Sequence, residues 1–168
     1  MEARHLGAAV AGLAALLAVA LVASAYVPAT LLHTGDAYGS ATVTVVGENG
    51  TELGVVDTRI ADTRSERITG LSDTDSLPKN TGMLFVHVRA GEQAYVMRDM
   101  DFPLDIVFVG ANHTITAIHE APLPPPGTDE ANLTRYRGTA KWVLEVNRGW
   151  TDRNGVTVGD RVAINYTG

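Results

Sequence analysis

The chain has 168 residues, no cysteine and a formal net charge of −6 at pH 7. The lack of cysteine excludes disulfides, thiolate catalysis and cysteine zinc sites, whatever the redox compartment. Only two lysines occur and the arginines are scattered, so the sequence excludes the basic patch that a nucleic-acid partner requires. The roughly 130 residues that follow an apolar N-terminal segment have the usual size of one domain.

The N-terminal segment has the length of a membrane span. Residues 6–27 carry no charged side chain, and as a helix they would extend about 33 Å, which matches the hydrocarbon core of a bilayer. We therefore expect residues 1–27 to form an apolar transmembrane helix that stays attached as an anchor. Ala23-Ser24-Ala25 matches a signal-peptidase site, so a cleaved signal peptide is the alternative.

The flanking charges predict the orientation of this helix. Arg4 precedes it and Asp36 follows it, which places the C-terminal domain outside the cytoplasm by the positive-inside rule. Sequons for N-glycosylation agree with that location. They begin at Asn49, Asn112, Asn132 and Asn165. We predict a single-pass protein of the cell membrane, or a secreted protein if the segment is cleaved.

A linker over residues 28–40 leads into a domain over residues 41–168 that is rich in β-strand signals. Residues 41–46 alternate threonine with valine, Asn49-Gly50 is typical of a type I′ turn, and residues 53–58 form the return strand. Thr63 and Glu66 form a capping box that opens a short helix ending near Leu71.

Further strands follow this helix. The alternation of apolar and polar residues predicts them at 83–88, 94–97, 104–109, 114–120, 140–147 and 161–166. Four prolines between Pro122 and Pro126 predict an exposed loop that reaches to about Arg135. About eight short strands with one small helix predict an all-β domain, either a sandwich or a barrel.

A set of short sequence pieces occurs in a characteristic order between residues 66 and 166. They are Glu66-Arg67 with Gly70-Leu71, Gly82 to Val86, Met97-Arg98, Pro103 to Ile106, Ile115 with Ala117-Ile118, Val143 to Val146 with Gly149, and Gly159-Asp160. In their order and spacing, these pieces resemble a known family, domain of unknown function 192. The chain departs from the family's pattern at Ser72, Val96 and Asp99. The resemblance implies a single β-sandwich of jelly-roll type, frequently behind a signal peptide or anchor, and implies no activity.

Several charged residues among the matching pieces are harder to explain by packing than the apolar ones. Asp105 lies between apolar neighbours, and a carboxylate buried there must be hydrogen-bonded or paired. We predict that Arg67, Arg98 and Asp105 line one cleft with Met97 at its floor, and that Glu145 is a less certain member. Asp99 completes the candidate groove. Either the groove holds a ligand carboxylate, a sugar or a peptide end, or these residues form a closed structural ion-pair network.

Catalytic and metal-binding alternatives have less support. The candidate metal ligands are His87, His113, His119, Glu120 and Glu145. However, the sequence has no His-x-His pair of the cupin type. Asp99 and Asp101 have the spacing of ordinary turn residues as well as that of an acid–base pair. No nucleophile elbow or phosphate-binding loop occurs. We therefore expect no catalytic residues, no metal and no cofactor.

The sequence predicts a membrane-anchored, extracytoplasmic binding or assembly module without enzymatic activity. Its partners would be the membrane, through the N-terminal helix, and an unidentified protein or small-molecule ligand. A hydrolase that acts on an extracytoplasmic polymer is the alternative, and it would need at least two titratable groups that converge in a pocket.

Overall fold

The computed structural model describes residues 38–167, so the predicted anchor and most of the linker lie outside the described residues. Within residues 38–167, no helix is long and apolar enough to span a bilayer. The elements in chain order are β1 (Ser40–Val46), β2 (Glu52–Ala61), α2 (Arg64–Thr69), β3 (Thr81–Tyr95), β4 (Leu104–Val109), β5 (Ile115–Ala121), the 3-10 helix η2 (Glu130–Asn132), β6 (Tyr136–Asn147), α3 (Trp150–Asn154) and β7 (Arg161–Thr167).

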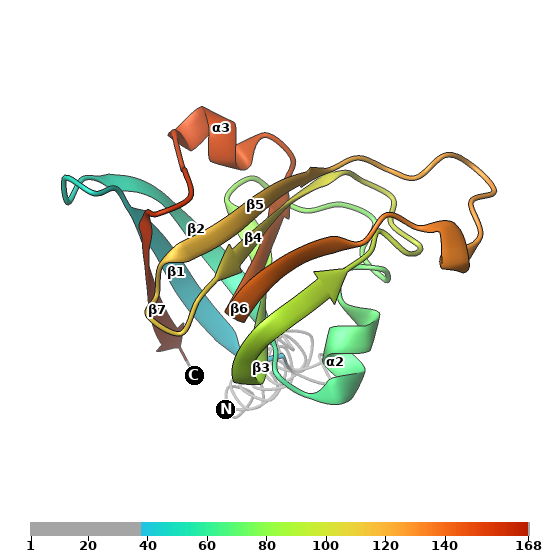
Figure 1. Ribbon diagram of the computed structural model, residues 1–168, viewed down its shortest axis with the longest axis horizontal. Helices are drawn as coiled ribbons and strands as arrows, with labels where there is room; N and C mark the ends of the chain where they lie inside the picture. Colours follow the sequence, from blue (N-terminus) through green and yellow to red (C-terminus); the bar gives the residue numbers. More distant parts are fainter. Residues whose placement is uncertain (1–37, 168) are drawn as a thin grey trace, which may run out of the picture. The chain divides into compact units, whose positions relative to one another are not determined.

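These seven strands form one sheet in the order β5-β4-β6-β3-β2-β1-β7 (Figure 1). Adjacent strands run antiparallel except β2 and β3, which run parallel and are joined by the connection that contains α2. The all-β class is therefore confirmed. The predicted sandwich of jelly-roll type is wrong, because a sandwich divides its strands between two sheets and here one sheet holds all seven described strands.

The sheet curls until its two edges meet at one end. Thr114, just before β5, forms a bridge with Arg161 at the start of β7. Backbone hydrogen bonds reinforce this closure: the Ile115 N–H donates to the Asp160 carbonyl at 2.9 Å, and the Val162 N–H donates to the His113 carbonyl at 2.9 Å. Curling replaces the second layer of a sandwich, since side chains on the inner face bury one another across the sheet.

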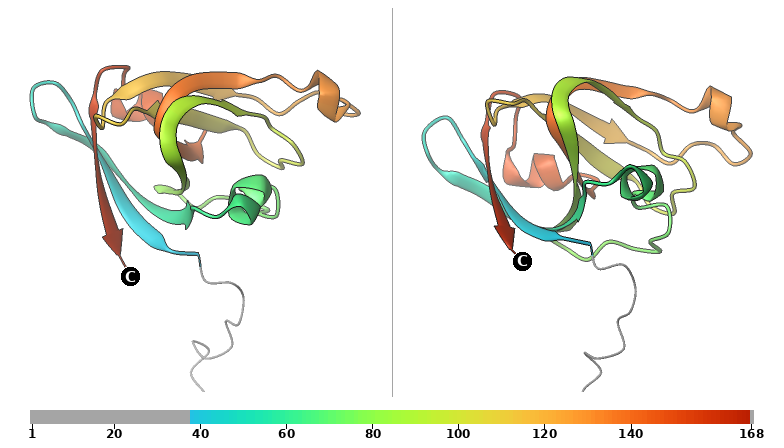
Figure 2. Two further views of the ribbon diagram at one scale, coloured as in Figure 1. Left: turned by 60° about the horizontal axis from the view of Figure 1, so that its bottom comes forward. Right: turned by 90° about the horizontal axis from the view of Figure 1, so that it is seen from below.

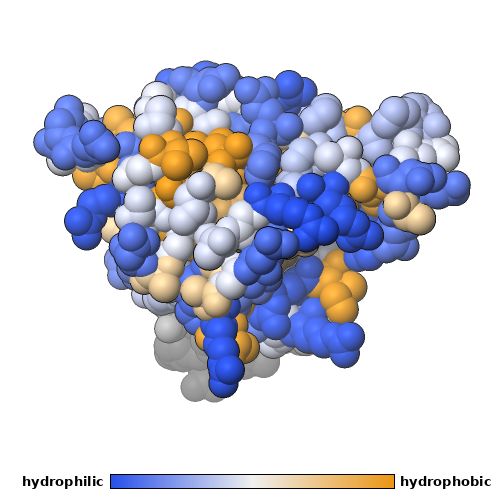
Figure 3. Space-filling view, in the orientation of Figure 1, coloured by the Kyte–Doolittle hydropathy of each residue, from blue (hydrophilic) through white to orange (hydrophobic). Residues whose placement is uncertain are grey.

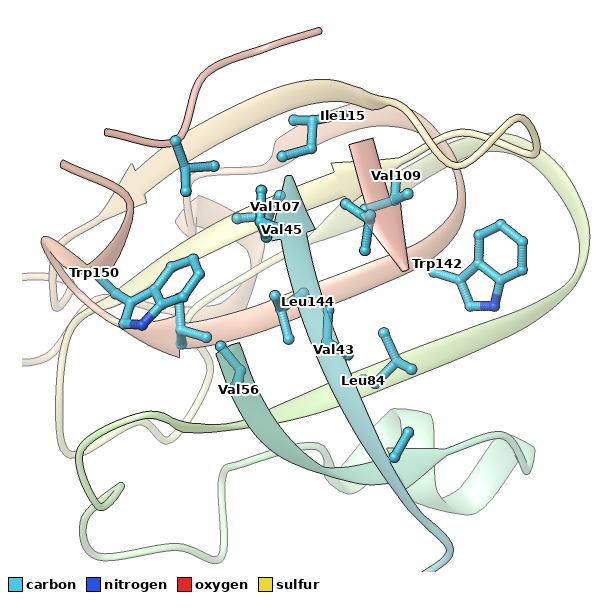
Figure 4. Close-up of a cluster of buried hydrophobic side chains, with 14 of the residues drawn as sticks. Val43, Val45, Val56, Leu84, Val107, Val109, Ile115, Trp142, Leu144 and Trp150 are labelled. Atoms are coloured by element: carbon cyan, nitrogen blue, oxygen red, sulfur yellow. The ribbon is translucent and has the colours of Figure 1, made fainter. Parts of the chain in front are cut away.

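Side chains on the inner face form the first hydrophobic core (Figure 4). This inner core joins strands that are far apart in the sheet order, because Val43 of β1 and Val107 of β4 belong to the same cluster. The predicted alternation in β6 is confirmed, since Trp142, Leu144 and Val146 all lie in it. Trp150 of α3 also packs here and is 3 % exposed. The sequence does not predict α3, which is only five residues long.

A second core lies on the outer face of β3, β4 and β6. It contains Met83 and Phe85 of β3, Ile106 and Phe108 of β4, and Val143 of β6. The connection through α2 lies beside the outer face, as the turned views show (Figure 2), and Leu71 at its end packs into this outer core. The sheet thus buries side chains on both faces over its central strands.

Local signals in the sequence set the start and the end of α2, which lies beside this outer core. The capping box is present, with Thr63 accepting from the Glu66 N–H at 3.2 Å and the Glu66 carboxylate accepting from the Thr63 N–H at 2.9 Å. Gly70 ends the helix at φ +54°, and a Cβ there would lie 3.3 Å from the Phe85 ring. The left-handed backbone of Gly70 therefore turns the chain directly over Phe85.

The predicted strands at 83–88 and 94–97 are parts of one long strand, β3. Its pairing with β6 is interrupted between Val86 and Gly91, so residues 87–90 form an irregular stretch that bends the strand. The sequence pattern breaks at this irregularity, which explains why it indicates two strands. The bend carries the second half of β3 over the end of α2.

Candidate functional site

A cavity of about 290 Å³ lies between α2 and the outer face of β3 and β6. Its apolar lining includes Leu71, Phe85 and Met100. Its ionisable lining residues come from four parts of the chain. They are Arg67 of α2, His87 and Tyr95 of β3, Arg98 of the segment after β3, and Glu145 of β6. The volume is at the lower end of the range for small-molecule sites.

Glu145 is a buried acid in the wall of this cavity. It stands opposite Met83 of β3 and Ile106 of β4 in the sheet, and it is only 6 % exposed. Burial raises the pKa of its carboxyl group to about 8. Because that value lies above neutral pH, the carboxyl is mostly protonated at pH 7.

The Glu145 carboxyl has no hydrogen-bond or ion-pair partner among residues 38–167. Every fully enclosed polar side-chain atom in this part of the chain does have a partner, so the Glu145 oxygens must be reachable from the cavity. A buried polar group without a partner costs free energy, which makes Glu145 unusual for a structural residue.

His87 and Tyr95 form a pair across the bend in β3. The His87 Nε2 and the Tyr95 hydroxyl lie 2.9 Å apart. The Tyr95 ring is fixed edge-on against Phe85 and Phe108, with ring centroids 5.0 and 5.9 Å apart. The hydroxyl is therefore held in place by packing on one side and by a hydrogen bond on the other.

The environment keeps both members of the pair uncharged near neutral pH. Burial, then the nearby Arg67 and Lys141 charges, lower the pKa of His87. Burial and the Glu145 carboxylate raise the pKa of Tyr95, whereas Arg67 opposes that rise. Glu145 and Arg67 therefore both lie close enough to Tyr95 for their charges to affect its hydroxyl group.

Arg67 joins α2 to β3. One guanidinium nitrogen, Nη1, donates to the Val86 carbonyl at 3.0 Å and also to the Asp62 carbonyl. Neither acceptor carries a charge, and none of the ion pairs in the described residues involves Arg67. Arg67 therefore brings an uncompensated positive charge to the cavity.

Arg98 contacts the other end of α2. Its Nη2 donates to the Ile68 carbonyl at 2.8 Å, and its Nη1 forms an ion pair with Glu130 at 3.1 Å. Asp99 is a weaker partner, with its carboxylate 3.9 Å from the Arg98 Nε. Arg98 is thus largely neutralised, and it holds α2 to the loop that contains η2.

The structure brings together only part of the predicted groove. Arg67, Arg98 and Glu145 line the same cavity. Met97 is 3 % exposed in the outer core, and together with Asp99 it borders a shallower depression beside the proline-rich loop. The predicted grouping of Asp105 with the arginines is wrong.

Asp105 lies on the opposite face of the sheet from Glu145. Ile106 is the cross-strand partner of Glu145, so its neighbour Asp105 must point the other way. One oxygen of Asp105 accepts from the Gly149 N–H at 3.0 Å, and the other accepts from the Thr151 N–H at 2.9 Å and the Thr151 hydroxyl at 2.7 Å. Asp105 thus fixes the turn into α3, which explains its burial without a ligand.

The residues considered as metal ligands are dispersed. His113 packs against Trp142, with ring centroids 4.3 Å apart, and His119 contacts the Arg137 carbonyl at 2.8 Å. Within residues 38–167, no three histidine or acidic side chains approach one another closely enough to hold a metal ion. The residues that line the cavity offer only one carboxylate and one imidazole, a poor set for a metal.

Sequence reasoning did not include His87 and Tyr95 in the groove. Only the interruption of the strand pattern between 88 and 94 signals that the chain bends there, and the bend brings the two side chains together. Pairing across an irregular stretch cannot be found by counting alternate residues.

Comparison with known proteins finds similar solved structures but no curated relative. No curated protein matches it. It is similar to a crystal structure from Sinorhizobium meliloti 1021 described as a "putative transcription regulator", with 27% identity and a TM-score of 0.68 over 77% of this chain and 97% of that chain. It is also similar to a protein of unknown function from Novosphingobium aromaticivorans DSM 12444, with 31% identity and a TM-score of 0.63 over 73% of this chain and 83% of that chain.

A family model supplies the assignment that these structures leave open. The model of domain of unknown function 192, described as an uncharacterized ACR, matches residues 44–164. That range holds all the residues that line the cavity and reaches from the first described strand to the last. The chain therefore belongs to the family of domain of unknown function 192.

Proposed function

We propose that this domain is a non-enzymatic binding module whose ligand occupies the cavity beneath α2. One observation carries the proposal: the buried Glu145 carboxyl faces the cavity and has no partner among the described residues. Natural structures rarely retain such a group unless something outside the chain satisfies it. The rigid His87–Tyr95 pair and the apolar lining give the site the mixture of surfaces that small-molecule pockets share.

We also propose that the module lies outside the cytoplasm and is attached to the membrane by its N-terminal segment. The support is the uncharged stretch over residues 6–27 and the four sequons, whose asparagines are all exposed. The face drawn in Figure 3 carries only small, separate apolar patches on a hydrophilic surface. On this face, the appearance favours ligand binding in a pocket over docking through a broad apolar surface.

A hydrolase is the second candidate, because a carboxyl with a pKa near 8 can act as a general acid. Hydrolysis of a glycan by the usual two-carboxylate route needs a second acid, and Glu145 is the only acid among the residues that line the cavity. Regulation of transcription is not part of the proposal, since the chain has a net charge of −6.

A cavity-filling variant tests the binding proposal. Ala94 lines the cavity and is exposed, so Ala94→Trp would fill the space without disturbing either core. Val88→Trp is the control, because Val88 is 82 % exposed and lies outside the lining. A set of small organic acids, amines and alcohols would be screened by NMR against the full-length chain. We expect cavity amides to shift in the wild type and in Val88→Trp, and not in Ala94→Trp.

Three results would contradict parts of the proposal. Release of new reducing ends or amines from a cell-surface polymer by the wild type, abolished in Glu145→Gln, would favour the hydrolase. Recovery of the full-length chain in the soluble cytoplasmic fraction would contradict the location, whereas N-terminal sequencing of a mature chain that begins at Tyr26 would replace the anchor with secretion.

A further inference from the structure

Two arginines line the cavity, and of these two only Arg98 has an acidic partner among residues 38–167. Arg98 is paired with Glu130 and Asp99, both of which lie outside the lining. Arg67 donates only to uncharged carbonyl groups, and both of these hydrogen bonds come from a single guanidinium nitrogen. The remaining guanidinium nitrogens have no partner among residues 38–167. A half-buried guanidinium with free donors attracts an anion.

Glu145 adds a second unsatisfied group to the same space. It is 6 % exposed, it lines the cavity, and its carboxyl group has no partner among residues 38–167. The charged and titratable residues around it are Arg67 from α2, His87 and Tyr95 from β3, and Arg98 from the segment after β3. On the other side, the cross-strand partner of Glu145 on β4 is the apolar Ile106. None of these groups pairs with the carboxyl, so a ligand that completes the site must provide its hydrogen-bond partner.

We propose that the ligand of this cavity is a small organic anion whose carboxylate is held between the Arg67 guanidinium and the Glu145 carboxyl group. This inference rests on the proposed binding function and identifies its ligand class. The apolar part of the ligand packs against Leu71, Phe85 and Met100. In this arrangement Glu145 keeps its proton and donates it in a hydrogen bond to the ligand, while Arg67 supplies the counter-charge. An ammonium ligand would face the free charge of Arg67 and is disfavoured.

The arrangement predicts a pH dependence with a definite sign. Glu145 binds the anion while protonated, and it repels the anion once ionised. Because burial raises the Glu145 pKa to about 8, affinity should be constant below about pH 7 and fall about tenfold by pH 9. His87 does not add a second transition in this range, because its pKa is lowered from the ordinary value.

The test compares probes of one size and different charge on the full-length chain. Benzoate, benzylamine and benzyl alcohol are titrated at pH 6.5, and binding is followed by the NMR shifts of the Leu71, Ala94 and Glu145 amides. Benzoate should bind about tenfold or more tightly than the other two, which is the usual scale of a charge-assisted hydrogen bond. Hippurate carries an amide next to its carboxylate, so tighter binding of hippurate than of benzoate would identify the end of a peptide as the natural ligand.

Variants then test the two contacts separately. Arg67→Gln should weaken benzoate about tenfold, and Arg64→Gln, an exposed arginine on the same helix, should not. Glu145→Gln preserves a hydrogen-bond donor, so it should bind benzoate at pH 6.5 but lose the pH dependence between 7 and 9. If Arg67→Gln unfolds, the comparison of probes on the wild type still decides the question.

The outcomes separate the two proposals. Binding of benzylamine in preference to benzoate at the cavity amides would overturn the anion and leave the binding function standing. Equal binding of all three probes would do the same. If no probe shifts the cavity amides, both the anion and the cavity as a binding site are wrong.

Discussion

Two buried acids on adjacent strands of the sheet have opposite surroundings. Asp105 of β4 is completely buried and receives three hydrogen bonds from the turn into α3. Glu145 of β6 is 6 % exposed and receives none from the described residues. The protein satisfies the first carboxylate itself and provides no partner for the second among the described residues. Burial alone therefore does not distinguish a structural acid from one that is proposed to bind a ligand, whereas the presence of partners separates the two.

Asp105→Ala should have the largest effect on stability. It leaves the Gly149 and Thr151 donors buried without an acceptor, and we expect a loss of about 3–5 kcal/mol in the free energy of unfolding. Chemical denaturation measures this loss. Asp152→Ala, an exposed acid in α3, is the control and should change little. A loss under about 1 kcal/mol in Asp105→Ala would remove the distinction between the two acids.

The contribution of Glu145 to stability should depend on pH. Its pKa is raised from 4.5 to about 8 on folding, so between these values the unfolded chain has released a proton that the folded chain keeps. The contribution of Glu145 to stability therefore falls as pH rises, by up to about 3 kcal/mol between pH 5 and 7. Denaturation curves of the wild type and Glu145→Gln across this range give the difference. Parallel pH profiles would mean that Glu145 is solvated or paired in the folded state.

Arg67→Ala should have an intermediate effect. It removes the hydrogen bond to Val86 that joins α2 to β3 and the hydrogen bond to Asp62 just before α2, at an expected cost of about 1–2 kcal/mol. Thermal unfolding would be compared with that of Arg64→Ala, which leaves both bonds in place. A cost above about 4 kcal/mol would indicate that Arg67 belongs to a closed structural network, as Asp105 does.

Arg98→Ala should have the smallest effect of the four. The Arg98 side chain is 36% exposed and that of its partner Glu130 is 70% exposed, so the pair should contribute under about 1 kcal/mol. Added salt should reduce the difference between wild type and variant, because exposed ion pairs are screened. A larger, salt-independent loss would mean that the hydrogen bond to Ile68 holds α2 in place.

The strands could be predicted because their signals are local. The presence of a turn at Asn49-Gly50, the capping box at Thr63 and the alternation around Leu144 all depend on residues close together in the sequence. The predicted type I′ geometry of that turn is wrong, because only Gly50 of the pair has a positive φ. The single curled sheet could not be predicted in the same way. Its closure depends on contacts between Thr114 and Arg161. No local pattern predicts pairing between residues so far apart in the sequence.

The candidate site also combines features that a local pattern predicts with features that it does not predict. Alternation correctly places Asp105 on one face of β4 together with Val107. It does not say which face of β4 continues the Glu145 face of β6, because that depends on the register between the two strands. The register pairs Glu145 with Ile106, one residue away from Asp105, and a shift of one residue reverses every side chain.

The pairing of β1 with β7 has a consequence for how this domain folds. Ser40 stands opposite Thr167, so the first and last strands of the described chain are neighbours, and the Ser40 hydroxyl donates to the Thr167 carbonyl across 127 positions of sequence. Contacts of such long range slow folding, because the loop between them must close first. Until β7 pairs with it, β1 has an unpaired edge that can recruit a strand from another chain. Aggregation during folding should therefore be most sensitive to changes in β7.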